Sequence, residues 1–267
     1  PGNARRDGSV QPDNKELSRM RHSKSLWIGA ALVAVALLLP TDTSAQRRSS
    51  SSSSWNDDDG PRETETVEKT VAFPDNGTLR LKNFSGDVHI VAGNGHDLKI
   101  KARRRASRER LDHIKLDVQS SGSSVTVNAN VPDASWERDH RNNNVVETAM
   151  EIEVPASARL DVDVFSSNVT VERVVGDQRL KTFSGEITVR DPRGADINAE
   201  TFSGDINVFV EPNAKGSVSF HSFSGALESK LNIASMSKKR RDIEGSLPGG
   251  AGPRLNFKTF SGDLQIK

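Results

Sequence analysis

The chain of 267 residues contains no cysteine and no tyrosine, and aromatic residues make up only 5% of it. The absence of cysteine excludes disulfides, thiolate catalysis, cysteine-ligated metals and an N-terminal lipidated cysteine. The 37 basic and 36 acidic residues leave a net charge of +1, so the chain also lacks the basic excess of a typical nucleic-acid-binding protein. We therefore expect a domain stabilised by backbone pairing and an economical core, with no nucleic acid as partner.

The segment "MRHSKSLWIGAALVAVALLLPTDTSAQ", which starts at Met20, has the order of parts of a secretory signal peptide. Basic residues precede an apolar run at residues 26–39, and small residues follow at a cleavage position. The run is shorter than the roughly 20 residues that a transmembrane helix needs. We expect a signal peptide at residues 20–45, cleaved near Ala45, and export to the periplasm, the cell surface or the medium.

Two polar segments flank this signal. Residues 1–19 precede a complete signal, so we expect translation to begin at Met20 and the leading segment to be absent from the natural product. Residues 46–66 hold a run of six serines and an acidic stretch that cannot bury enough apolar surface to fold. They predict a disordered linker rather than a Ca²⁺ loop, which would need spaced ligands and a distal glutamate. The folded domain is then expected at residues 67–267.

The predicted domain repeats one phrase, Phe-Ser-Gly, followed by a short polar residue and alternating Ile or Val. Apolar residues recur three residues before the phenylalanine and four and six residues after it, which predicts strands with one buried face. The phase of this alternation changes near Ser-Gly, and glycine tolerates the positive φ that such a corner needs. The second copy reads Phe-Ser-Ser, and the copies centre on Phe84, Phe165, Phe183, Phe202, Phe223 and Phe260.

The copies from Phe165 to Phe223 are spaced by 18, 19 and 21 residues, which indicates stacked coils. We predict an all-β fold, a β-solenoid (β-helix-like) of strand–corner–strand repeats of about 20 residues, with a solenoid-like β-sandwich as the alternative. Each coil is expected to add one phenylalanine to an internal stack. Phe183 and Phe202 would then be buried neighbours, and truncating either should cost about 3–5 kcal/mol.

Two stretches interrupt the pattern. Between residues 91 and 160, "HDLKIKA" and "SSVTVNANV" predict strands, "ASRERLDHIKLDV" predicts a short helical turn before a strand, and "WERDHRNNN" predicts a loop. The insertion at residues 229–253 separates the last two copies and fits one degenerate coil plus a loop. Since the pattern runs to Lys267, the last coil is expected at the end of the array. The insertion and its "KKRR" would shield that end, and self-association through the solenoid ends is the alternative.

The phrases "EIEVPASARLDVDVFSSNVTV", "GDQRLKTFSGEITV" and "LNFKTFSGDLQI" resemble the bacterial putative-adhesin family. The resemblance covers roughly residues 67–267. It implies β-strand-repeat domains of unknown function in exported and membrane-linked proteins, built as a β-solenoid or a solenoid-like sandwich. It supplies no catalytic residue that could be carried over.

Short polar residues follow the corners, and stacked carboxylates could bind Ca²⁺. One carboxylate per coil is too few for a closed site, so we expect these side chains to bind local backbone N–H groups. The row consists of Asp87, Asn168, Glu186, Asp205 and Asp263, with Ala226 as the exception. No histidine of the exported part has a partner at zinc-ligand spacing, so surface positions are expected for His89, His96, His113, His140 and His221.

Two basic clusters, at residues 99–110 and 238–241, could contact an anionic envelope polymer if they shared one face, but acidic neighbours favour solvated surfaces. We expect no catalytic, cofactor-binding or metal site. The predicted function is a surface or envelope-associated adhesion-like or scaffold module without catalysis. The partner would be an envelope polysaccharide or another protein. The alternatives are a carbohydrate-active enzyme on a β-helix, which would need two opposed carboxylates, and a binder of anionic envelope polymers.

Overall fold

The structure is a computed structural model that describes residues 61–139, 145–239 and 241–267. The segment 1–19, the predicted signal peptide and most of the predicted linker lie outside the described residues. The first strand, β1, begins at Arg62, inside the segment assigned to the linker. In the part of the chain that the structure describes, no helix combines the length and the apolar character needed to cross a membrane.

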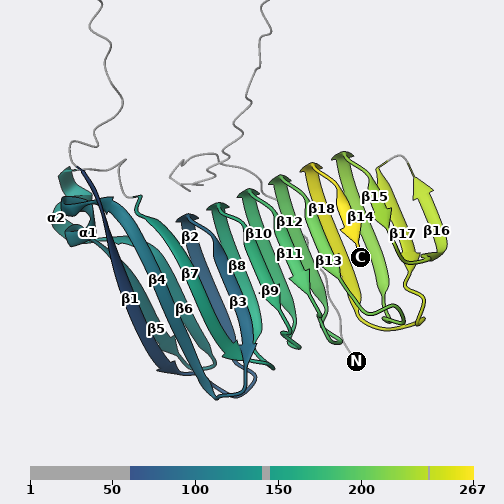
Figure 1. Ribbon diagram of the computed structural model, residues 1–267, viewed down its shortest axis with the longest axis horizontal. Coiled ribbons are helices and arrows are strands. Elements are labelled where there is room, and N and C mark those ends of the chain that lie inside the picture. Colours follow the sequence, from purple (N-terminus) through teal and green to yellow (C-terminus); the bar gives the residue numbers. More distant parts are fainter. Residues whose placement is uncertain (1–60, 140–144, 240) are drawn as a thin grey trace, which may run out of the picture. The chain divides into compact units, whose positions relative to one another are not determined.

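The described residues form two large, mostly parallel sheets with a common core between them, so the all-β prediction is confirmed (Figure 1). Sheet A has the spatial order β1 (Arg62–Ala72), β4 (Asp97–Ser107), β7 (Glu147–Pro155), β3 (Val88–Gly93), β9 (Val169–Glu172), β11 (Ile187–Arg190), β13 (Ile206–Phe209), β19 (Leu264–Ile266) and β15 (Leu227–Ser229). Sheet B has the order β16 (Ala234–Lys239), β17 (Asp242–Ser246), β14 (Ser217–Ser224), β18 (Arg254–Ser261), β12 (Ile197–Ser203), β10 (Gln178–Ser184), β8 (Arg159–Ser166), β2 (Thr78–Ser85), β6 (Ser124–Pro132) and β5 (Ile114–Ser121).

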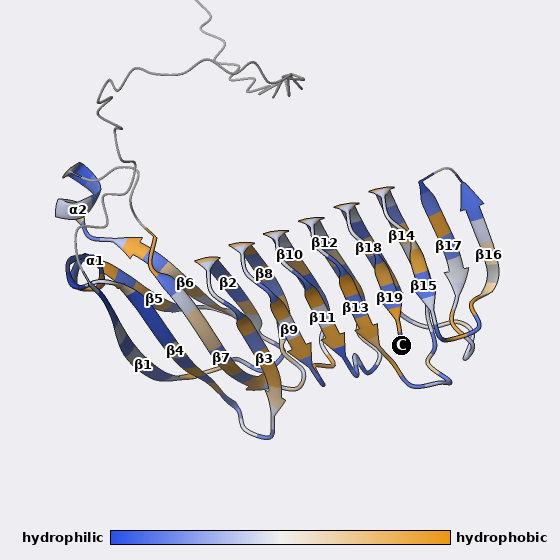
Figure 2. Ribbon diagram, turned by 45° about the horizontal axis from the view of Figure 1, so that its top comes forward, coloured by the Kyte–Doolittle hydropathy of each residue, from blue (hydrophilic) through white to orange (hydrophobic). Residues whose placement is uncertain are grey.

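Each copy of the repeat contributes one strand to each sheet, as the sequence predicts. The strand before Ser-Gly lies in sheet B, and the strand after it lies in sheet A. Equivalent residues of neighbouring coils pair in parallel register, for example Leu180 with Ala199 and Ile187 with Ile206, and all four are buried. Figure 2 shows hydrophobic strand segments at the same level on β9, β11 and β13. Each fully buried Leu or Ile stabilises the fold by about 1.5–3 kcal/mol.

The corner glycines allow the coils to approach each other closely. Gly204 has φ +147°, and a Cβ there would lie 2.1 Å from the carbonyl oxygen of Gly185 in the next coil. Gly262 has φ +151° and would meet the carbonyl oxygen of Gly204 at 2.0 Å. A side chain is therefore excluded by the neighbouring backbone as well as by the local dihedral.

The spatial order of the coils differs from their order in the chain. Strand β18 lies between β12 and β14, and β19 lies between β13 and β15, so the last coil of the sequence is inside the array (Figure 1). Asp196 contributes to the pairing of β18 with β12, because its carboxylate accepts hydrogen bonds from the backbone N–H of Arg254 at 2.8 Å and from its guanidinium at 2.9 Å. These contacts lower the pKa of Asp196.

The prediction that the insertion shields the last coil is therefore wrong. The insertion contains no degenerate coil among its described residues. It forms the antiparallel hairpin β16–β17, which pairs with β14. The hairpin extends sheet B beyond the coil of Phe223, and the coil of Phe260 has a coil on each side.

The first part of the domain is antiparallel and carries two short helices. Strands β1, β4 and β7 pair antiparallel, as do β5 and β6, and helix α1 (Arg108–His113) precedes β5, as predicted. Helix α2 (Ala134–Asp139) replaces the first residues of the loop expected at "WERDHRNNN"; residues 140–144 lie outside the described residues. The reason is Asp133, whose Oδ1 accepts the N–H groups of Ser135 and Trp136 and so caps the helix. Hydrogen bonds from the Ser135 hydroxyl and the Trp136 N–H hold the pKa of Asp133 well below its usual range.

Candidate functional site: an aromatic ladder on the outer face of sheet B

The six repeated phenylalanines form a continuous stack on the surface, which we call the Phe ladder. The order is Phe84, Phe165, Phe183, Phe202, Phe260 and Phe223, with centroid separations of 4.7–4.9 Å and interplanar angles of at most 16°. The side chains are between 42% and 52% exposed. The predicted stacking of neighbouring coils is therefore confirmed, but the prediction of an internal stack with Phe183 and Phe202 buried is wrong.

The residue before each phenylalanine explains this orientation, because it points into the corner and is polar in most coils. Thr182 donates its hydroxyl to the carbonyl oxygen of Ser167 at 3.0 Å, and Thr201 donates to Gly185 at 3.2 Å. In the first coil, the Asn83 amide donates to Gly86 and Thr148. These buried side chains satisfy carbonyl groups where the backbone turns between sheets. Since side chains alternate along a strand, the next residue, phenylalanine, must point outward.

The stacking leaves ring edges, rather than ring faces, available for contact. Each inner ring is covered on both faces by its neighbours, and at the Phe223 end the guanidinium of Arg241 lies 4.2 Å above the ring centroid. The edge of an aromatic ring is apolar and carries partial positive charge. The ladder therefore presents a narrow apolar strip along the stacking direction.

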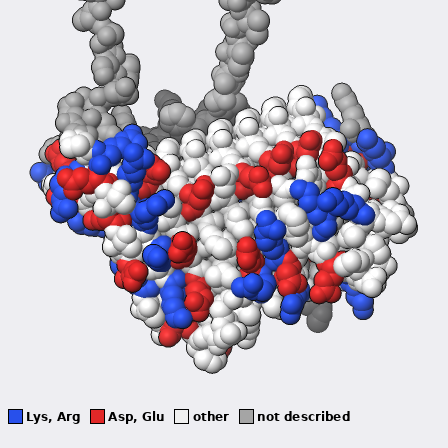
Figure 3. Space-filling model, viewed as in Figure 1, with Lys and Arg blue, Asp and Glu red and all other residues white. Residues whose placement is uncertain are grey.

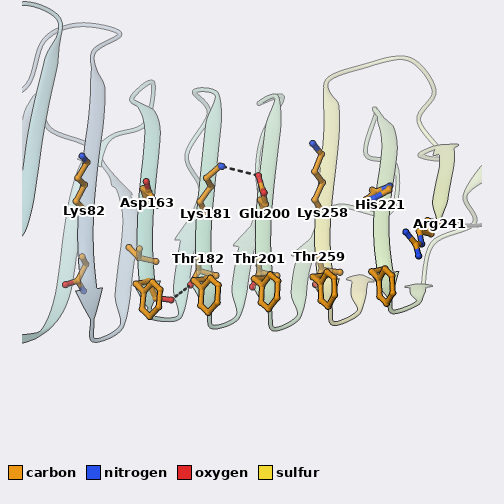
Figure 4. Close-up of a pocket in the computed structure, with 17 residues that line it drawn as sticks. Lys82, Asp163, Lys181, Thr182, Glu200, Thr201, His221, Arg241, Lys258 and Thr259 are labelled. Atoms are coloured by element: carbon orange, nitrogen blue, oxygen red, sulfur yellow. Dashed lines mark hydrogen bonds and ion pairs between the residues drawn. The ribbon is translucent and has the colours of Figure 1, made fainter. Parts of the chain in front are cut away.

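A second row runs parallel to the Phe ladder, two residues earlier on each strand, and we call it the charge ladder. Its order across the strands is Lys82, Asp163, Lys181, Glu200, Lys258 and His221. Figure 4 shows these side chains in one line beside the rings. Charges of opposite sign alternate along this row from Lys82 to Lys258.

Some members of the charge ladder are paired and others are not. Lys181 contacts Glu200 at 3.2 Å, and His221 contacts Asp242 at 2.6 Å. Asp163 and Lys258 are exposed and have no ion-pair partner among the residues that the structure describes. The two ladders line an open groove of about 760 Å³ on this face, with Arg241 at one end.

Three of the five polar residues after the corners bind backbone N–H groups, as predicted, whereas Asp87 and Glu186 accept hydrogen bonds from side chains. Asn168 accepts the N–H of Glu186 at 2.9 Å, Asp205 accepts that of Asp263 at 2.8 Å, and Asp263 accepts that of Ala226 at 2.8 Å. Their oxygens thus link successive coils. Within the described ranges, no group of three or more His, Asp or Glu residues is placed to hold a metal ion.

The histidines of the described part lie at the surface or partly exposed, each beside an acidic side chain. His89 contacts Glu172 at 3.4 Å, and His113 contacts Asp133 at 2.8 Å. His96 lies 3.9 Å from Asp75, whereas His140 lies outside the described residues. No two of these described histidines converge on a position where they could bind zinc together.

The two basic clusters lie apart and the first is largely neutralised. Residues 99–105 belong to β4, near one end of sheet A, whereas Lys238 and Lys239 lie on β16 and Arg241 directly precedes β17, at the opposite end of the array in sheet B. Lys99 contacts Glu153 at 3.0 Å and Lys101 contacts Glu151 at 3.9 Å, both across the β4–β7 register. Figure 3 shows basic and acidic side chains interspersed over the visible face. The clusters do not form one basic surface.

The sequence contained a signal for the exposed phenylalanines. The positions five, three and one residues before the phenylalanine lie on the same face of the strand. In the coil of Phe202 each of them holds a buried side chain, namely Ile197, Ala199 and Thr201. If the alternation is continued through the threonine, the phenylalanine lies on the opposite, exposed face. The threonine is easily taken for a surface residue because its hydroxyl is polar.

The family described as Toastrack DUF4097 matches residues 64–267, which is most of the chain. A putative cell adhesion protein from Clostridium sporogenes is similar in fold, with a TM-score of 0.55 at 12% identity, covering 77% of this chain and 99% of that one. A putative adhesin from Bacteroides fragilis aligns over 76% of this chain and 97% of its own, at 10% identity and a TM-score of 0.26. None of the curated proteins matches the chain.

Proposed function

The chain belongs to the Toastrack DUF4097 family, and on this premise we propose that it is an exported, envelope-associated, adhesion-like module that acts through the outer face of sheet B. The observation that carries the proposal is the Phe ladder: six half-exposed aromatic rings in one unbroken row. Contiguous exposed apolar surface with a polar rim is typical of interaction sites. The charge ladder provides that rim along one side.

The neighbour in fold that is described as a putative cell adhesion protein favours binding over catalysis. The two carboxylates of the groove, Asp163 and Glu200, stand two strands apart with Lys181 between them, and Glu200 is paired with that lysine. This arrangement gives no support to the alternative of a carbohydrate-active enzyme. The separation of the basic clusters likewise gives none to a binder of anionic polymers.

A screen of the exported chain, from Gln46 onward, against envelope fractions and glycans tests the proposal. The ladder variant is Phe183→Thr with Phe202→Thr, because threonine suits an exposed strand position. The control is Val175→Thr, which removes a 44% exposed apolar side chain outside the Phe ladder. We expect the control to bind as the parent does and the ladder variant to lose at least about tenfold in affinity, roughly 1.4 kcal/mol. Unchanged binding by a folded ladder variant would overturn the assignment of this face.

A further inference from the structure

We propose that the partner of the Phe ladder face is a second copy of this chain. Its stack of coils runs in the opposite direction, and a two-fold axis parallel to the strands passes between β10 and β12. The inference rests on the proposed function, because it names an occupant for the same face. Such an axis reverses the order of coils and keeps each row of side chains opposite the same row of the partner.

The order of charges in the charge ladder carries this inference. In the antiparallel arrangement the second coil faces the fifth, so Asp163 of each molecule meets Lys258 of the other. The third coil faces the fourth, so Lys181 meets Glu200. Asp163 and Lys258, which have no ion-pair partner in the described part of one chain, thus become partners between chains. At the ends, Lys82 faces His221, which carries the carboxylate of Asp242 beside it.

A slip by an odd number of coils is unfavourable, whereas a slip by two coils keeps opposite charges facing each other but leaves two coils of each ladder uncovered. A slip by one coil places Lys82 against Lys258, Asp163 against Glu200, and Lys181 against itself. A two-fold axis along the stack that keeps ring against ring would place the two charge ladders on opposite sides of the interface, where they do not meet. Like charges directly opposite each other are destabilising, so among the registers that pair opposite charges the one with the largest overlap is favoured.

The two nearest rows are compatible with this register, whereas the row at the start of the strands places Arg159 opposite Arg254 and Asp177 opposite Asp196, like charges that oppose the association. The serines that follow each phenylalanine are uncharged. Two residues before the charge ladder, the facing pairs are Arg80 with Ser219, Asp161 with Asn256, and Arg179 with Asn198. No pair in this row combines two charges of the same sign.

The Phe ladder favours another ladder over a sugar. Sugars stack on free ring faces, and here neighbouring rings cover the faces of the inner rings. A second ladder offers an apolar strip of equal length and equal repeat, about 4.8 Å per coil. The apolar edges of both ladders would leave water together.

The size of the face predicts weak association. Six strands at about 4.8 Å, each about 25 Å long, give a face of roughly 700 Å² per molecule. This is near the lower end of specific interfaces, which bury about 800 Å² per partner. We expect a dissociation constant on the order of 10–100 μM at low salt, rising with salt because the charge ladders are exposed.

Sedimentation velocity across about 1–500 μM protein tests the proposal with charge-reversal variants. Asp163→Lys places lysine opposite Lys258, and Lys258→Asp places aspartate opposite Asp163, so each variant alone should weaken the dimer at least about tenfold. An equimolar mixture of the two variants should dimerise again, because both facing pairs then combine opposite charges. Glu151→Lys makes the same charge change on the outer face of sheet A and should leave dimerisation unaltered.

A parent protein that stays monomeric throughout this range would overturn the inference, as would a mixture that associates no better than its components. These outcomes are distinct from failure of the proposed function. If the protein is monomeric and Phe183→Thr with Phe202→Thr still abolishes binding in the screen, the face is a contact surface for another partner. If neither self-association nor ladder-dependent binding occurs, the proposed function fails as well.

Discussion

At the scale of single residues, the phenylalanine of each repeat and the residue before it have different structural roles. The polar residue before each phenylalanine, as at Thr201, is buried and bonds the corner backbone. The phenylalanine itself stacks on its neighbours while remaining half exposed. Phe220 and Phe257, which lie three residues earlier in their coils, are buried in the core, as is Phe73 before the first copy of the repeat. Residue type alone does not distinguish a stacked surface phenylalanine from a core phenylalanine, whereas its place in the alternation of the strand does.

This division predicts unequal costs for two truncations. Phe202→Ala should lower the free energy of unfolding by about 1–2 kcal/mol, because it loses two ring stacks and little burial. Phe257→Ala, at a side chain 1% exposed, should lower it by about 3–5 kcal/mol through lost burial and a cavity. Urea denaturation at low protein concentration measures both. Equal losses for the two variants would contradict the orientation described here.

At the scale of the element, the corner between sheets A and B is set by glycine. The carbonyl oxygen of Gly185 occupies the space that a side chain at position 204 would need, and the same relation recurs between Gly204 and Gly262. At these corners the coils stack at strand spacing because the corner residue lacks a Cβ. The second coil departs from this rule with Ser167, which is buried and does not have positive φ.

Gly204→Ala should destabilise the domain by about 2–4 kcal/mol, since it combines an unfavourable dihedral with a clash against backbone. Gly95→Ala is the matched control, because the nearest atom to its Cβ would lie 3.9 Å away. The control should change the midpoint of thermal unfolding by no more than a degree or two. A Gly204→Ala protein that melts with the control would show that the corner can relax.

At the scale of the whole domain, sequence reasoning predicted the coils but not their order. The period, the alternation and the Ser-Gly corners specify local structure, and each was recovered. The strands of all coils have nearly the same sequence pattern, however, so the repeat does not predict that β18 lies between β12 and β14. The contact between Asp196 and Arg254 joins residues 58 positions apart, and Asp177 makes the equivalent contact to the backbone N–H of Asp196, 19 positions away, so the contact recurs between coils and does not identify which coil is the neighbour.

The candidate face could not be predicted from the sequence for a different reason. All members of both ladders were visible in the sequence, but the phenylalanines were assigned to the core because aromatic residues are usually buried. The charge ladder could not be recognised without the coil order, because His221 precedes Lys258 in the chain and follows it in space.

Engineered disulfides test the order of the coils. The exposed residues Asn198 and Asn256 pair in register on β12 and β18, so cysteines at both positions should cross-link readily. Ser219 lies one strand further, on β14, at about 9.6 Å from Asn198, which is too far for a disulfide. Oxidation followed by non-reducing electrophoresis distinguishes the pairs. Efficient cross-linking of positions 198 and 219 instead would indicate that the coils follow the order of the chain.

The central claim is that the repeated phenylalanines form an exposed surface, and thiol labelling tests it most directly. The chain has no cysteine, so Phe202→Cys and Phe257→Cys each carry a single thiol. At about 1 μM protein, where the proposed dimer is dissociated, the thiol at position 202 should react within about tenfold of the unfolded rate. The thiol at position 257 should react at least about a hundredfold more slowly, because it must wait for the core to open. Comparable protection at both positions would contradict the account, since it would place the Phe ladder inside the fold.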